Sequence, residues 1–368
     1  MTTSIPKPRI HHPGLETNAI GLTRRDYEGA MSTLCAGCGH DSITAAIIRA
    51  FWELSIAPHR VAKLSGIGCS SKTPTYFLRE AHGFNSVHGR MPSIATGAGA
   101  ANRDLIMIGI SGDGDSLSIG LGQFCHAMRR AVRMLYVLEN NGVYGLTKGQ
   151  FSASADVGTK AKRGEANRNA PIDPVLLALS LGATFVARSF SGDKEQLVPI
   201  LKAGLAHRGF AFIDVISPCV TFNDHEGSTK SYRFTREHMK EVVAADFIDA
   251  QNSGNGSADA PDLVPLRTEI TAAYPAGSTY DVRMHDGSTV RLRKVADDFD
   301  QGDRDAVFAY IRDRQRAGEV PTGLLYIEPG AADMHEIDGT VDTPLAQLDY
   351  ATLCPGADAL DALMEDFR

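Results

Sequence analysis

Two short glycine-bearing turns, each following an apolar run, constrain the fold of this chain most strongly. Residues 105–110 form an apolar run that is followed by Gly-Asp-Gly-Asp at 112–115. Residues 134–138 form a second run that is followed by Asn-Asn-Gly-Val-Tyr-Gly at 140–145, and the small residues at 118–130 predict a helix between the two. This strand–turn–helix–strand order predicts a parallel α/β sheet. Both turns then lie at the carboxyl ends of neighbouring strands, where open α/β sheets bind ligands.

The residues of these turns offer oxygen ligands for a hard cation. Asp113 supplies a carboxylate, Asn141 an amide oxygen and Val143 a backbone carbonyl. Mg²⁺ takes about six oxygen ligands, often including oxygens of a bound phosphate, and glycine lets the backbone approach a diphosphate closely. Gly-Asp-Gly alone is a weak signal. Together with the Asn-Asn pair one strand later, it predicts a site for magnesium and a phosphate-bearing ligand.

Length and charge exclude several classes of protein. The chain has 368 residues and a formal net charge of −7, which fits one large domain or two modest ones and gives no indication of a nucleic-acid or anionic-membrane partner. The N-terminal segment lacks the apolar core of a signal peptide. No run approaches the ~20 apolar residues of a membrane span. We therefore expect a globular cytoplasmic protein.

The spacing of the cysteines indicates a metal or cluster site. Cys35 and Cys38 form a Cys-x-x-Cys pair directly before a predicted helix, for which Asp41 or Ser42 is the expected cap. A c-type haem site needs His directly after the second cysteine, where Gly39 stands. A redox dithiol stays open as an alternative. Structural zinc usually needs a second close pair, which this chain lacks.

Two further cysteines follow predicted strands. Cys69 lies in a glycine–serine loop after a strand at 60–64, and Cys219 follows a strand at 211–216. Scattered cysteines of this kind suit an iron–sulfur cluster that is assembled in three dimensions. Cys125 and Cys354 are predicted to be structural thiols.

Two polar residues near these motifs are candidates for substrate contact. Lys72 follows the Cys69 loop, and a substrate carboxylate would need such a charge, although a lone lysine is usually solvated. His88 precedes a helix of small residues at 93–102 and could contact phosphate or substrate, or be an ordinary loop residue.

The chain divides into three predicted parts. Residues 1–30 are polar and form an N-terminal arm, and residues 31–233 carry the α/β motifs. Residues 234–368 form a C-terminal extension, in which 251–262 read as a flexible connection. The extension holds a β-hairpin at 280–295, helices at 304–316 and 357–367, and a strand at 322–327.

These motifs together resemble the β subunit of the 2-oxoacid:ferredoxin oxidoreductases, most closely the 2-oxoglutarate type. The resemblance covers roughly residues 34–233. It rests on LCAGCGH, GIGCSSK, HGRMPSIATGAG, GDGDSLSIG, NNGVYGLTKGQ and SPCVTFNDHEGSTKS in this order. It implies that residues 31–233 form the diphosphate-binding domain for thiamine diphosphate, a mostly parallel sheet with helices on both faces, and carry one [4Fe–4S] cluster.

The resemblance also implies the site residues, each at a matching motif position. Cluster ligands are expected to be Cys35, Cys38, Cys69 and Cys219, and Mg²⁺ ligands Asp113, Asn141 and the carbonyl of Val143. Cofactor contacts are expected at Ile67, Gly68, Cys69, Ser70, His88, Gly112, Gly114, Asp115, Gly145 and Leu146. On the reactive side of the cofactor we expect Lys72, His88 and Leu146, with Lys72 binding the distal carboxylate of 2-oxoglutarate.

The implied reaction is the reversible oxidative decarboxylation of 2-oxoglutarate with coenzyme A to succinyl-CoA and CO₂, with electrons passing through the cluster to ferredoxin. A thiamine enzyme also needs a catalytic glutamate on a pyrimidine-binding domain. We therefore expect an α subunit to supply it in an αβ or (αβ)₂ assembly. Three alternatives stay open: a pyruvate or branched-chain 2-oxoacid enzyme of the same family, a non-redox thiamine decarboxylase or synthase, and a non-catalytic zinc-binding or electron-transfer module.

Overall fold

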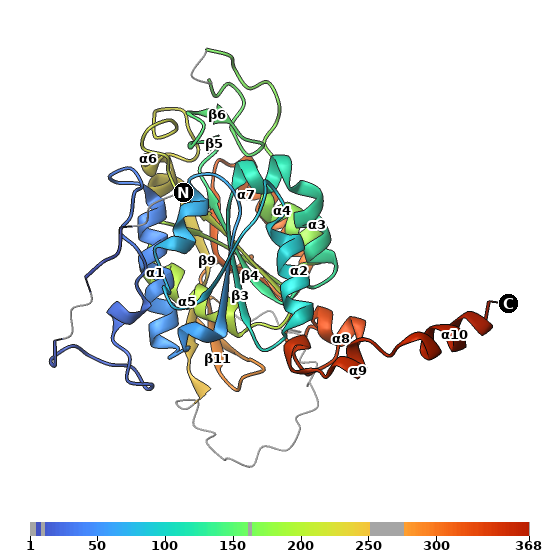
Figure 1. Ribbon diagram of the computed structural model, residues 1–368. Helices are drawn as coiled ribbons and strands as arrows, with labels where there is room; N and C mark the ends of the chain where they lie inside the picture. Colours follow the sequence, from blue (N-terminus) through green and yellow to red (C-terminus); the bar gives the residue numbers. More distant parts are fainter. Residues whose placement is uncertain (1–4, 9–11, 161–163, 251–275, 368) are drawn as a thin grey trace.

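One ten-stranded sheet forms the centre of the protein in the computed structural model, which describes residues 5–8, 12–160, 164–250 and 276–367 (Figure 1). The strand order is β10-β11-β9-β12-β7-β8-β4-β3-β1-β2. The strands are β1 (Val61–Ser65), β2 (His82–Asn85), β3 (Ile106–Gly112), β4 (Met134–Asn140), β7 (Phe185–Phe190), β8 (Phe210–Ile216), β9 (Met239–Ile248), β10 (Thr279–Arg283), β11 (Thr289–Lys294) and β12 (Val320–Ile327).

The six strands from β7 to β2 in this order are all parallel. Every residue of β4 and of β8 is buried, as expected for parallel strands that are covered on both faces. β12 pairs antiparallel with β7 and parallel with β9, while β9, β11 and β10 form an antiparallel end. The predicted mostly parallel sheet is confirmed.

Helices cover both faces of the sheet (Figure 1). α1 and α5 pack against each other on one face, and α2 and α3 pair on the other, with α4 beside α7. No helix within the described residues is long and apolar enough to cross a membrane. The helices are α1 (Gly39–Glu53), α2 (Met91–Ala101), α3 (Leu121–Arg129), α4 (Pro174–Ser180), α5 (Lys194–Ala206), α6 (Tyr232–His238), α7 (Arg304–Arg316), α8 (Met334–Asp338), α9 (Tyr350–Leu353) and α10 (Ala357–Glu365).

Two sequence-based boundaries were wrong for identifiable reasons. α1 begins at Gly39 with Cys38 at its N-cap, so neither Asp41 nor Ser42 caps it. Gly39 allows this early start, because a Cβ there would lie 2.5 Å from the hydroxyl oxygens of two serines on neighbouring strand ends. The helix predicted at 118–130 starts late, because Gly114–Ile119 forms a wider helical turn first.

The C-terminal extension joins the same sheet. The hairpin predicted at 280–295 is confirmed as β10–β11, and the helix predicted at 304–316 is confirmed as α7. β2 and β9 were not predicted. The connection predicted at 251–262 lies outside the described residues. Because β9 to β12 continue the sheet beyond β7, the division at residue 233 stays a prediction rather than a visible boundary.

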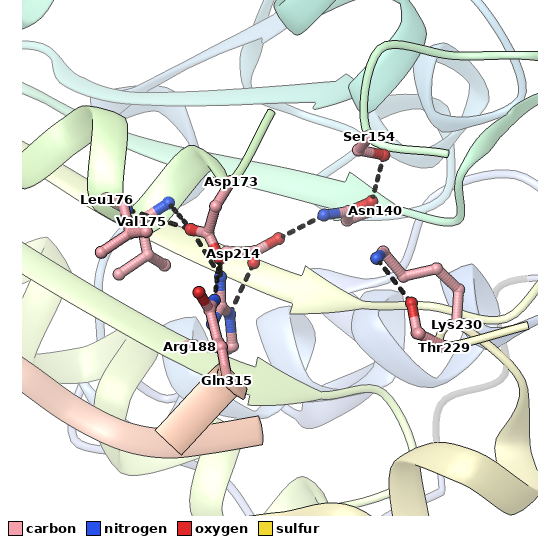
Figure 2. Close-up of polar contacts among 10 residues, drawn as sticks. All are labelled: Asn140, Ser154, Asp173, Val175, Leu176, Arg188, Asp214, Thr229, Lys230 and Gln315. Atoms are coloured by element: carbon pink, nitrogen blue, oxygen red, sulfur yellow. Dashed lines mark hydrogen bonds and ion pairs between the residues drawn. The ribbon is translucent and has the colours of Figure 1, made fainter. Parts of the chain in front are cut away.

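A buried arginine ties β7 and β8 to the helices above them. Arg188 Nε donates to Asp214 Oδ2 at 2.8 Å, and its Nη2 donates to both oxygens of Asp173 at 2.8 and 2.9 Å (Figure 2). Gln315 of α7 also donates to Asp173, and Asn140 donates to Asp214 at 3.0 Å. Burial alone would raise the pKa of Asp173, but the adjacent guanidinium outweighs it and lowers that pKa.

We expect Arg188→Met to destabilise the protein by about 3–5 kcal/mol, because it leaves the buried Asp214 and the partly buried Asp173 without their cation. The measurement is the free energy of unfolding in urea. Arg316→Met is the matched control, since Arg316 is 69% exposed in its pair with Asp313 and such pairs contribute about 0–1 kcal/mol. Equal losses in the two variants would contradict a structural role for the Arg188 network.

Candidate cofactor and cluster site

Asp113 lies at the carboxyl end of β3 and is 1% exposed. Its Oδ2 accepts hydrogen bonds from the hydroxyls of Ser152 and Ser154, the latter at 2.7 Å, and its Oδ1 accepts one from the backbone N–H of Asn141 at 3.3 Å. Burial raises the pKa of Asp113. A bound cation would favour the ionised carboxylate again, so this environment fits a metal ligand.

The second turn is held in place by its own polar groups. Asn141 Oδ1 accepts a hydrogen bond from the Val143 N–H at 3.0 Å, and Asn223 Nδ2 donates to the Asn141 carbonyl at 2.8 Å. Gly142 between them has φ +77°, and a Cβ there would lie 2.6 Å from Asn223 Nδ2. The turn leads into the short hairpin of β5 (Val143–Tyr144) and β6 (Gln150–Phe151).

The predicted magnesium ligands thus come from neighbouring turns. Within the described part of the chain, no three His, Cys, Asp or Glu side chains converge as ligands of one metal ion. The predicted magnesium ligands are of another kind, since they consist of one carboxylate, one amide oxygen and one backbone carbonyl. Such a set leaves coordination positions for phosphate oxygens and water, as Mg²⁺ requires.

Asp115 has a positioning role in the structure. Its Oδ1 accepts from the Gly89 N–H at 2.8 Å and its Oδ2 accepts from the Ser111 hydroxyl at 3.0 Å. A Cβ on Gly89 would lie 2.5 Å from the Cα of Gly120, so the loop that carries Gly89 packs tightly against the end of the helical turn Gly114–Ile119. These contacts hold the exposed His88 at the rim of the site. The cofactor contacts predicted for Asp115 and His88 stay predictions.

The buried hydroxyl of Ser70 lies at the same end of the sheet, near Gly112. Ser70 is 2% exposed, and its Oγ has no hydrogen-bond partner among the described residues. A Cβ on Gly112 would lie 3.0 Å from this Oγ. An unpaired buried hydroxyl costs about 1–3 kcal/mol, which a ligand could recover. The residues at the end of β3 therefore fit a bound cofactor, and Gly112 lets the Ser70 hydroxyl approach the strand end closely.

The remaining predicted cofactor residues border this loop and the next one. Ile67 and Gly68 are half-buried after β1, and Gly68 has φ +126°. Gly114 is covered by the Tyr144 ring, whose hydroxyl donates to the Gly114 carbonyl at 2.8 Å. Leu146 lies in the β5–β6 turn and is 48% exposed. The structure brings these residues to one end of the sheet, and their individual roles stay predictions.

Two of the predicted cluster cysteines meet over Gly145. A Cβ on Gly145 would lie 3.1 Å from Cys69 Sγ and 3.8 Å from Cys219 Sγ. The Thr221 hydroxyl donates to Cys35 Sγ at 3.5 Å, which brings the Cys-x-x-Cys segment to the loop that carries Cys219. The structure therefore gathers cysteines from separate segments beside the turn that carries Asn141 and Val143.

The Cys-x-x-Cys pair forms a tight turn. The Cys38 N–H donates to the Cys35 carbonyl at 3.0 Å, and Gly37 has φ +78°. Cys125 lies within α3, and Cys354 is exposed in the C-terminal segment. Neither of these two residues is in the group.

Burial keeps the bare thiols protonated. It raises the pKa of Cys38 to about 12 and that of Cys69 to about 11, and it also raises the pKa of Cys219. The nearby positive charge of Lys72 acts in the opposite direction on Cys69. Metal ions bind the thiolate and displace its proton, so these thiols would become ionised ligands only with iron bound.

Sequence reasoning missed a buried acid beneath these cysteines. Glu139 is 0% exposed, accepts from the Thr73 hydroxyl at 3.0 and 3.1 Å, and lies 3.5 Å from His40 Nδ1. His40 also contacts the Ser217 hydroxyl at 2.7 Å. Burial raises the pKa of Glu139 well above its ordinary value and lowers that of His40 to about 4, so burial shifts both groups toward their uncharged forms. The sequence did carry a signal for Glu139, because an acid directly after the apolar run at 134–138 is unusual.

Comparison with known proteins agrees with this geometry. Residues 66–215 match the family described as "Thiamine pyrophosphate enzyme, C-terminal TPP binding domain". A 2-oxoacid:ferredoxin oxidoreductase subunit beta of Saccharolobus solfataricus is 45% identical over 199 residues, which are 54% of this chain and 65% of the relative. The chain thus spans just under two thirds of that relative's length. The "2-oxoacid:ferredoxin oxidoreductase 2, subunit beta" of Aeropyrum pernix is 41% identical over 262 residues, or 71% of this chain and 84% of the relative.

A solved structure extends the likeness to most of the chain. It is 2-oxoglutarate:ferredoxin oxidoreductase from Magnetococcus marinus with 2-oxoglutarate, coenzyme A and succinyl-CoA bound. The match has a TM-score of 0.69 and 28% identity, and it covers 95% of this chain and 99% of the other. The predicted thiamine-diphosphate-binding fold is confirmed. With most of the Aeropyrum relative aligned at 41% identity, this chain belongs to the family of 2-oxoacid:ferredoxin oxidoreductase β subunits.

Proposed function

We propose that this chain is the β subunit of a 2-oxoglutarate:ferredoxin oxidoreductase, which converts 2-oxoglutarate and coenzyme A to succinyl-CoA and CO₂. One observation carries the proposal. Cys69 and Cys219 lie against Gly145, in the turn that also carries Asn141 and Val143. A cluster and a magnesium-bound cofactor would therefore share one turn, which suits transfer of electrons between them.

Each proposed group has residues that fit it. Asp113, Asn141 and the Val143 carbonyl would hold Mg²⁺, and the unpaired Ser70 hydroxyl would donate to the cofactor. The four cysteines at 35, 38, 69 and 219 would hold one [4Fe–4S] cluster. When bound, thiamine diphosphate supplies the electron sink for decarboxylation and the cluster accepts single electrons.

The chain's own residues would orient and enclose these groups. Ser152 and Ser154 fix the Asp113 carboxylate, and Asn223 fixes the turn that carries Asn141. Burial raises the pKa of Glu139, which favours its uncharged form beside the cluster thiolates. Such fixed dipoles and neutral groups limit reorganisation when an electron arrives.

Lys72, His88 and Leu146 are proposed to face the substrate, with Lys72 paired to its distal carboxylate. Lys72 is half-buried in the 3₁₀ turn Ser70–Thr75, close enough to Cys69 to affect its pKa. The Lys72 ammonium would therefore lie between the cluster ligand Cys69 and the bound substrate.

The proposed partners are an α subunit and ferredoxin. The "subunit beta" names of the relatives support an α partner, which would supply the pyrimidine-binding domain and the catalytic glutamate. The bound molecules of the Magnetococcus structure support coenzyme A and 2-oxoglutarate as substrates. Ferredoxin, the αβ or (αβ)₂ assembly and the cytoplasmic location stay predictions.

Metal and cofactor analysis after anaerobic purification tests the proposal. We expect iron and acid-labile sulfide in equal amounts, four of each per chain if one [4Fe–4S] cluster is bound. We also expect thiamine diphosphate and magnesium, and no stoichiometric zinc. Thiamine without iron would indicate a non-redox thiamine enzyme, and zinc or iron without thiamine a non-catalytic module. Either result would reject the proposed function.

Gly145→Ala should disrupt the cluster, because its Cβ would lie 3.1 Å from Cys69 Sγ. We expect lower iron content and a weaker electron paramagnetic resonance signal of the reduced cluster, with the free energy of unfolding changed less. Gly122→Ala in α3 is the control, since a Cβ there meets nothing within 4 Å. Full cluster content in Gly145→Ala would place the cluster elsewhere.

Lys72→Ala should lower kcat/KM for 2-oxoglutarate relative to pyruvate in the assembled enzyme. The loss of a charge-assisted hydrogen bond of ~1.5–3 kcal/mol predicts a change of roughly 10- to 100-fold. Lys194→Ala, which removes an exposed charge from α5, is the control. Iron content must be measured in parallel, because Lys72 also acts on Cys69. An unchanged substrate preference with an intact cluster would remove Lys72 from substrate recognition.

A further inference from the structure

A cavity of about 350 Å³ lies on one face of β1 and β2, and none of the predicted cofactor contacts lines it. The register places Lys63 of β1 beside Gly83 of β2, and Ser65 beside Asn85. Neighbours in register point to the same face of a sheet, so these four residues line the same wall. Ser71, which follows the predicted cofactor loop, also lines the cavity.

Lys63 is the unusual member of this wall. It is 8% exposed and lies in a strand whose other residues are also buried. Its Nζ donates to the Phe77 carbonyl at 2.7 Å and lies 5.4 Å from the centre of the Phe77 ring. No carboxylate pairs with it among the described residues, and burial lowers its pKa to about 8. Two of its three N–H donors remain for another acceptor.

The cavity is cationic. Arg79 lines it together with Lys63, and its described lining holds no aspartate or glutamate. Glu28, whose carbonyl accepts from the Arg79 backbone, has its own carboxylate paired with Lys7 at 2.9 Å. Burying a lysine without an acid is unfavourable unless an anion completes the site.

Polar groups of the wall complement the two cations. The Ser65 hydroxyl donates to Asn85 Oδ1 at 2.8 Å, which turns the amide nitrogen of Asn85 away from that bond and leaves it as a donor. The Ser71 hydroxyl donates to the Gly68 carbonyl at 2.5 Å, which joins the cavity wall to the predicted cofactor loop. A Cβ on Gly83 would meet nothing within 4 Å, so there is open space directly beside Lys63.

We propose that this cavity is a second binding site, for a small dianion that Lys63 and Arg79 hold, namely a phosphate monoester or a dicarboxylate. Two positive side chains in a lining without aspartate or glutamate match two negative charges, and the ligand oxygens would accept hydrogen bonds from the remaining Lys63 N–H groups and the Asn85 amide. The Phe77 carbonyl and ring satisfy only part of the ammonium's hydrogen-bonding capacity. The site adds to the proposed function and does not depend on it.

Calorimetric titration of the full chain with inorganic phosphate and, separately, with glutarate tests this proposal. Saturating thiamine diphosphate and Mg²⁺ are present, so that the heat of phosphate binding cannot come from binding at the proposed diphosphate site. We expect at least one of the two probes to bind the wild type, and the two titrations distinguish a phosphate site from a dicarboxylate site. Lys63→Met and Gly83→Val should each weaken binding at least tenfold, the first by removing the charge and the second by filling the open space.

Lys194→Met is the matched control, because it removes an exposed positive charge outside the cavity and should leave the affinity unchanged. Thermal unfolding of each variant verifies that it is folded, and Gly83→Val, which alters no charged group, serves if Lys63→Met fails to fold. Absence of binding by both probes would overturn the proposal. So would binding that survives Gly83→Val, since the dianion would then lie outside the cavity.

Discussion

A chain of buried hydrogen bonds joins the carboxyl ends of the central strands, and the site depends on it. The Ser154 hydroxyl contacts both Asp113 at the end of β3 and Asn140 of β4. Asn140 also donates to Asp214 of β8 (Figure 2). Asp214 in turn holds Arg188 of β7. Because every member is buried and most are paired on both sides, displacement of one strand end would leave polar groups unpaired. The position of the predicted metal ligand is therefore fixed by contacts that reach across the neighbouring strands β3, β4, β8 and β7.

Burial has opposite consequences for the acids at this edge. Asp214 and Asp173 stay paired with a guanidinium, whereas Glu139 has only a hydroxyl donor and a neutral histidine nearby, so its pKa is raised well above the ordinary value. The cysteines above Glu139 share that low-dielectric environment. Groups that must remain charged thus lie on the Arg188 side of the sheet. The pocket proposed for the cluster contains an acid whose pKa burial raises and thiols that only a metal would ionise.

Local sequence patterns predicted much of the fold and the membership of the site. Apolar runs that end in Gly-Asp-Gly-Asp and in Asn-Asn-Gly predicted β3 and β4 with their turns, because strand burial and turn chemistry are both encoded locally. β9 was missed because its burial alternates only in part and it pairs with strands far away in sequence. Ser152 and Ser154 were missed because a serine in a polar loop carries no signal of what its hydroxyl contacts.

The sequence by itself determined which residue types could do the chemistry: a carboxylate and an amide after two parallel strands, and cysteines in three segments, two of which have glycine beside the cysteine. Residue chemistry and the short-range rules for strands and turns are sufficient for that. Only the tertiary structure decided that Cys69 and Cys219 meet over Gly145, and that Lys63 lies beside open space without an acid. These facts depend on strand order and register, which arise from contacts between residues distant in the chain.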